Sequence, residues 1–177
     1  PPYNALKSWK KKQGKAETRL NPNGWFKNDD MDWDEYYTFI KNSILNVKSN
    51  SYYICCDFRI YPLLYNLLIE LEYEIKHCIV WAKNVWGLGK RYRFQHEFVI
   101  YATKNNPKFI GDKSQSDVWN IDVDRSKEHK TPKPVELPVK AIKNTINKKE
   151  LCIDIFLGSG TTLIACEKTN RKCYGME

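Results

Sequence analysis

Hydrophobic positions along the chain follow two spacings, one typical of helices and the other of strands. Apolar side chains three and four residues apart predict amphipathic helices over 32–48, 60–71 and 134–147. Short apolar runs predict strands over 52–57, 75–82, 94–103, 151–156 and 172–176. Asp32 is a suitable N-cap for the first helix, while Pro62 and Pro134 fit the first turns of the other two. We interpret the apolar helix faces as core rather than as a binding site.

The stretch 151–177 has the most informative pattern. A short apolar run predicts a buried parallel strand, Gly158-Ser159-Gly160 follows, and 161–168 favours a helix before the second strand. Glu177 lies 17 residues after Gly160, close to the spacing of about 20 expected for an acidic residue that binds ribose hydroxyls. This pattern indicates a nucleoside cofactor. Only two of the three usual glycines are present, so a nicotinamide or flavin site is not favoured, and an ordinary strand–turn–helix with a flexible loop is the alternative.

The order of elements predicts an α/β fold with a mostly parallel sheet and helices on both faces. The runs 75–82 and 94–103, joined through Gly87-Leu88-Gly89, predict a hairpin, so we expect the sheet to end with an antiparallel strand. The segment 105–130 is predicted to be a loop that contains one short apolar island, 118–121. Asp57 falls at the predicted carboxyl edge of the sheet, where ligands bind in such folds.

Composition and charge restrict the partners. The 177 residues carry a net charge of +8, which suits a polyanion as well as an unspecialised basic surface. In 4–30, basic residues alternate with Trp9, Trp25 and Phe26, a pattern that fits DNA contacts or a solvated loop. The six cysteines form no C-x-x-C pair and are interpreted as free thiols rather than zinc ligands or disulfides. We predict no metal site. Without a signal peptide or spanning segment, a soluble cytoplasmic protein without a membrane partner is expected.

Four segments together resemble one family. Pro1-Pro2-Tyr3 and the run from Asp154 to Thr162, DIFLGSGTT, resemble the two hallmark motifs of the DNA amino-methyltransferases, which methylate adenine N6 or cytosine N4 with S-adenosylmethionine. Residues 129–137 resemble the segment that precedes the glycine strand in that family, and 94–97 resemble its late hairpin. The order, with the Pro-Pro-Tyr motif first, is similar to the family's β arrangement.

The resemblance implies a Rossmann-like methyltransferase fold that is truncated at both ends, because the acidic residue before Pro1 and the strands after Glu177 are missing from the sequence. It also implies one catalytic domain over 1–177, with a target-base half (1–103), a connector (104–130) and a cofactor half (131–177). The connector is too short for the target-recognition domain that many members insert there. S-adenosylmethionine is the implied cofactor, and double-stranded DNA is the implied partner, together with a cognate restriction endonuclease.

The resemblance assigns roles to particular residues. The implied catalytic residues are Pro1, Pro2 and Tyr3: the Pro1 carbonyl, held still by the fixed proline backbone, and the missing acidic side chain would accept the amino protons of a flipped base, and Tyr3 would stack on it. The implied cofactor residues are Asp154, Phe156, Gly158, Ser159, Gly160, Thr161, Glu177, Thr131 and Lys133. The implied nucleic-acid residues are Lys10, Lys11, Lys12, Lys90, Arg91, Arg93 and His96. Each also has a structural interpretation: Asp154 as a brace of the turn, Phe156 as core and His96 as an ordinary strand histidine.

Three alternatives remain open. Adenine N6 is the first choice of target, but cytosine N4 is not distinguished, since the deciding first residue of the Pro-Pro-Tyr motif is not in the sequence. A cofactor- or DNA-binding module without catalysis is the second alternative. Methylation of RNA or protein is the third.

Overall fold

The computed structural model describes residues 31–87, 91–123 and 133–176. Its strands form two sheets among these residues. The larger contains β1 (Ser51–Cys56), β2 (Glu74–Ala82), β3 (His96–Thr103) and β4 (Val118–Asn120). The smaller pairs β5 (Leu151–Asp154) with β6 (Lys172–Gly175) in parallel. The helices are α2 (Trp33–Asn46), α3 (Tyr61–Glu70), α4 (Glu136–Thr145) and α5 (Thr161–Thr169).

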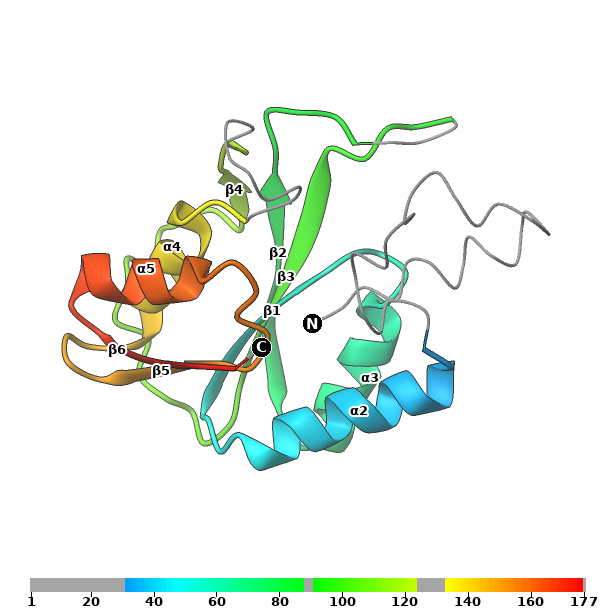
Figure 1. Cartoon of the computed structure of the whole chain (residues 1–177), viewed down its shortest axis with the longest axis horizontal. Helices are drawn as coiled ribbons and strands as arrows, with labels where there is room; N and C mark the ends of the chain where they lie inside the picture. The colour runs from blue at the N-terminus through cyan, green and yellow to red at the C-terminus, as the bar shows by residue number, and fades with distance from the viewer. Residues whose placement is uncertain (1–30, 88–90, 124–132, 177) are drawn as a thin grey trace.

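Helices cover both sides of the larger sheet, as predicted (Figure 1). On one side α2 and α3 pack on Ile54, Ile100 and Ala102, and on the other α4 contributes Leu137 beside Trp81. Each fully buried leucine or isoleucine side chain contributes about 1.5–3 kcal/mol to folding. Helix α5 lies against α4 through a third small cluster that includes Ala165 and Cys166.

Local signals account for the helix boundaries. Asp32 accepts a hydrogen bond from the Asp34 amide (3.1 Å), and Glu35 closes the capping box. Pro62 lies in the first turn of α3, where a missing amide hydrogen costs nothing. The predicted starts of α2 and α3 are therefore confirmed within one residue, although α2 ends at Asn46 rather than near Lys48.

Three expectations about the sheets were wrong. The predicted hairpin forms, but β3 lies between β1 and β2 in the order β1-β3-β2-β4, so the antiparallel strand is internal and not terminal. The apolar island at 118–121 forms β4, which pairs in parallel with β2. Finally, β5 is parallel but not buried, because Leu151 and Ile153 are 42% and 44% exposed on the face away from α5.

The thiols, the helix lengths and the grouping of metal-ligating side chains bear on three further expectations. All six cysteines are free, with Cys56 and Cys166 buried and the other four half-buried. In the described ranges, no helix is both long and apolar enough to cross a bilayer. Among the same residues, no group of three or more His, Cys, Asp or Glu side chains is arranged to hold a metal ion.

Candidate cofactor and nucleic-acid site

Asp154 holds the turn that follows β5. Its carboxylate accepts hydrogen bonds from the Phe156 amide (2.9 Å) and from the Thr162 hydroxyl (2.6 Å). The end of β6 fixes the same turn, since the Met176 amide donates to the Asp154 carbonyl (2.9 Å) and the Leu157 amide to the Met176 carbonyl (2.8 Å). Both oxygens of the Asp154 side chain therefore brace the loop between strand and helix.

The two glycines of this turn adopt left-handed backbone conformations. Gly158 has φ +51° and Gly160 has φ +79°, a region that costs other residues roughly 1–2 kcal/mol. Gly160 is the N-cap of α5, and no side chain of the described residues caps this helix end. Because the first amides of a helix have no intrahelical acceptors, the start of α5 offers hydrogen-bond donors and a partial positive charge to a ligand.

Other predicted cofactor residues surround this turn. The Thr161 hydroxyl lies 3.2 Å from that of Ser159 and donates to the Lys133 carbonyl (3.2 Å), which joins the segment before α4 to the start of α5. The Phe156 ring packs edge-on against Phe39 of α2, with ring centroids 5.7 Å apart. Phe156 therefore anchors the turn on the larger core. Thr131 and Glu177 lie outside the described residues, as do Pro1, Pro2 and Tyr3.

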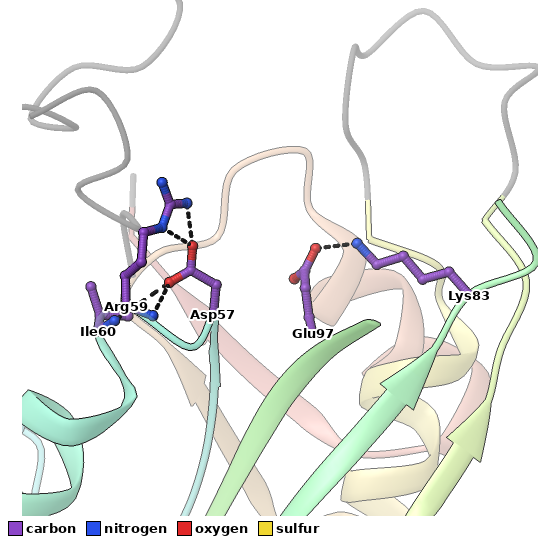
Figure 2. Close-up of polar contacts among 5 residues, drawn as sticks. All are labelled: Asp57, Arg59, Ile60, Lys83 and Glu97. Carbon is purple, nitrogen blue, oxygen red and sulfur yellow. Dashed lines mark hydrogen bonds and ion pairs between the residues drawn. The ribbon is translucent and has the colours of Figure 1, made fainter. Parts of the chain in front are cut away.

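A second part of the site lies at the end of β1 and the start of the antiparallel strand β3. Figure 2 shows two carboxylates side by side, Asp57 directly after β1 and Glu97 near the start of β3, each held by its own cation. Asp57 accepts from the Arg59 amide (2.9 Å) and Nε (2.7 Å), and its side chain also lies 3.4 Å from the Ile60 amide. Asp57 therefore fixes the turn that precedes α3 as well as marking the sheet edge.

Glu97 forms an ion pair with Lys83, and the two side chains are only 18% and 19% exposed. The ammonium of Lys83 also lies 4.6 Å from the centre of the Trp81 ring. Taking two charges out of water is costly unless they pair, so this half-buried pair fixes the position of both groups at the sheet edge.

Electrostatics at Cys55 link the two parts of the site. Burial raises the pKa of this thiol at the end of β1; Lys133 lowers it, whereas Glu97 and Asp154 raise it further. The packing agrees, because the Phe156 ring of the glycine turn lies against the core cluster that contains Cys56 at the end of β1. The end of β1, the glycine turn and the start of β3 therefore lie at one edge of the molecule, as expected for the carboxyl edge of an α/β sheet.

The predicted nucleic-acid residues that the structure describes lie on or beside the β2–β3 connection. Arg91 and Arg93 belong to this connection, whose described parts extend beyond the sheet (Figure 1). His96 begins β3 and packs beside Phe98 at 5.2 Å; since side chains alternate along a strand, it lies on the opposite face from Glu97. Lys10, Lys11, Lys12 and Lys90 lie outside the described residues.

A cavity of about 620 Å³ lies at the other end of the strands. It is lined by Lys76 and His77 from the start of β2 and by Thr103 from the end of antiparallel β3. The Thr103 hydroxyl is buried without a hydrogen-bond partner in the described structure. The glycine turn, Asp57 and Glu97 do not contribute to this cavity, so we place the candidate site at the carboxyl edge instead.

Sequence reasoning missed three features of the site. Thr162 was not assigned, although it is the second residue of α5 and its hydroxyl reaches back to the carboxylate at the end of β5. The pairing of Lys83 with Glu97 has a signal in the hairpin, because Glu97 lies opposite Trp81 and Lys83 is two residues further along, on the same face. At Gly175, an added Cβ would lie 2.6 Å from Leu157 Cδ2, so this glycine lets β6 approach the turn.

Fold and site together define a class: a Rossmann-like α/β protein with a glycine turn at the carboxyl end of its smaller sheet, packed beside the end of β1 in the larger one. The whole chain, residues 1–177, matches the family of N6/N4 DNA methylases, and the protein belongs to that family.

Individual relatives agree. The type II methyltransferase M2.MboI of Moraxella bovis is 32% identical over 130 residues, which are 63% of this chain and 48% of the relative. M2.LlaDCHI of Lactococcus lactis subsp. cremoris is 28% identical over 138 residues, 64% of this chain and 51% of the relative. The chain thus spans about half the length of these two relatives.

Solved structures give the same fold. The M1.HpyAVI–SAM complex superposes with a TM-score of 0.67 at 27% identity, over 79% of this chain and 74% of that one. The cytosine-N4-specific PvuII DNA methyltransferase gives a TM-score of 0.69 at 18% identity, over 81% and 65%. The Rossmann-like methyltransferase fold expected from the sequence is therefore confirmed.

Proposed function

We propose that the full protein transfers the methyl group of S-adenosylmethionine to the exocyclic amino group of a base in double-stranded DNA, with adenine N6 as the first target. The observation that carries the proposal is the meeting of the Asp154-braced glycine turn with the end of β1, beside the charged start of β3. Family membership supports the reaction class. Cytosine N4 is the alternative target, because one structural relative acts there.

The residues of the glycine turn have distinct roles in this proposal. The uncapped start of α5 and the backbone of Gly158 to Gly160 bind the amino-acid end of the cofactor. Asp154 positions this backbone without needing to touch the cofactor itself. Thr161 and Lys133 close the pocket from the α4 side. When bound, S-adenosylmethionine supplies an activated methyl group on a sulfonium.

The chain's own contribution to the methyl transfer is positioning and electrostatics. The base must leave the helix stack to reach the carboxyl edge. Pro1, Pro2 and Tyr3 are proposed to receive it there, as the motif implies. Glu177 is proposed to bind the cofactor ribose, and Thr131 to line the same pocket. We also propose that 1–177 forms one catalytic domain that acts in the cytoplasm, with a cognate endonuclease as partner.

The test is methyl transfer by the full-length protein from tritium-labelled S-adenosylmethionine to unmethylated DNA, with RNA in a parallel reaction. Digestion to nucleosides and mass spectrometry then identifies the product. N6-methyladenine in DNA supports the first choice, and N4-methylcytosine supports the alternative. Cofactor binding without transfer to either polymer would contradict the proposed enzyme and indicate a binding module.

A further inference from the structure

The described parts of the β2–β3 connection, 83–87 and 91–95, form an arm with a fixed base. The Lys83 amide donates to the Gln95 carbonyl (2.8 Å), and the Gln95 side chain donates back to the Lys83 carbonyl (3.1 Å). The Gly87 amide donates to the Phe94 carbonyl (2.6 Å), and a Cβ at Gly87 would lie 3.2 Å from that oxygen. The pairing of the hairpin therefore continues beyond both strands and sets the direction of the arm (Figure 1).

Exposed aromatic rings gather on this arm and beside it. Trp86 is 60% exposed and Phe94 is 51% exposed. Phe94 stacks on Phe58 of the neighbouring loop at 5.8 Å, and the Arg93 guanidinium lies 5.7 Å from the Trp86 ring. Arg93 also donates to the Gly87 carbonyl (3.0 Å). These contacts keep several rings and cations in place at the carboxyl edge.

Tyr92 differs from these rings because it is 91% exposed, between Arg91 and Arg93. A ring this exposed contributes little apolar burial to folding. Arginines on both sides are suited to phosphates on either side of one step in a duplex. A planar side chain held between two phosphate contacts has the shape of a wedge that enters between bases.

We infer that Tyr92 inserts into the DNA stack and occupies the space left by the extruded target base. This inference rests on the proposed function and adds a positioning residue to it. The ring stacks on the neighbouring bases and slows the return of the target base, while Arg91 and Arg93 hold the flanking backbone. The aromatic face is what matters, so the phenol oxygen is dispensable.

The test compares Tyr92→Ala with Tyr92→Phe in the full-length protein, on a duplex that contains the mapped target. The matched control is Tyr65→Ala, which removes a 39% exposed tyrosine from α3. Transfer is measured on the matched duplex and on one with an abasic site opposite the target base, which lowers the cost of extrusion. Fluorescence of 2-aminopurine at the target position reports extrusion without requiring turnover.

Tyr92→Ala is expected to lower transfer to the matched duplex by roughly tenfold or more and to reduce the 2-aminopurine signal, because unstacking is costly. The abasic duplex should restore most of the transfer, and Tyr92→Phe and Tyr65→Ala should behave like the wild type. Unchanged transfer by Tyr92→Ala, or an equal loss on both duplexes, would overturn the inference that Tyr92 inserts into the DNA stack. If the wild-type protein transfers to no DNA, the proposed function itself fails, whereas a wedge failure leaves wild-type transfer intact.

Discussion

The brace at Asp154 leads to the prediction with the clearest magnitude. Asp154→Asn keeps the size of the side chain but removes its charge and one of its two acceptor oxygens. Hydrogen bonds to a charged group contribute about 1.5–3 kcal/mol each, so the loss of one should lower the free energy of unfolding by about that amount. Thr162→Val removes the other member of the 2.6 Å bond without changing its shape. The double variant should cost less than the sum of the two single variants by about 1 kcal/mol, because both remove one interaction.

The same variants should weaken cofactor binding. A turn that must be reordered at a cost of about 1.4 kcal/mol binds about tenfold more weakly. Isothermal titration calorimetry with S-adenosylmethionine measures the affinity, and urea unfolding measures the stability. Thr169→Val is the matched control, because it removes a buried hydroxyl of α5 that bonds to the Ala165 carbonyl (2.7 Å), away from the turn. Strictly additive costs together with unchanged affinity in both Asp154→Asn and Thr162→Val would refute the reasoning.

Three further predictions concern other parts of the chain. Gly160→Ala and Asn170→Ala each place alanine at a left-handed position at one end of α5 (φ +79° and +58°). Gly160→Ala should lower stability by about 1 kcal/mol and also weaken cofactor binding, whereas Asn170→Ala should lower stability alone. Calorimetry checks this, and equal affinities of the two variants for S-adenosylmethionine would contradict it. A double-mutant cycle on Lys83 and Glu97 should give a coupling energy above that of the exposed pair Lys104–Glu72, which is expected below about 1 kcal/mol. Equal coupling energies for the two pairs would contradict the stronger interaction expected of the half-buried one. Burial raises the pKa of Cys152, Cys166 and Cys173 to about 11 from about 9, so stability should be constant below pH 9 and fall as pH rises toward 11, as followed by thermal unfolding; stability that rises over that range would show the opposite shift.

Local chemistry explains why much of the fold could be predicted. The start of α2 depends on Asp32 and Glu35, three residues apart, and the strand–turn–helix around Gly158 and Gly160 is equally local. Non-local pairing could not be predicted in this way. The place of β3 between β1 and β2 depends on contacts between distant segments, and no periodicity encodes it.

The short strand β4 illustrates the same limit. Three residues have too weak a pattern to indicate a strand, and tertiary contacts stabilise this one. Trp119 is buried, and the Trp81 indole donates to the Ile121 carbonyl just beyond the strand (2.8 Å). At the site, the motif indicated Asp154 but not the bond from Thr162 that shows what the carboxylate does.

The central claim is that cofactor and DNA share the carboxyl edge of the sheet. Hydrogen exchange of the full-length protein with S-adenosylmethionine, with target DNA and with both tests it most directly. The account predicts that the cofactor slows exchange in 155–163 and that DNA slows exchange in the described parts of the arm, 83–87 and 91–95. Cofactor protection confined to the cavity around His77 and Thr103, at the opposite end of the strands, would contradict it.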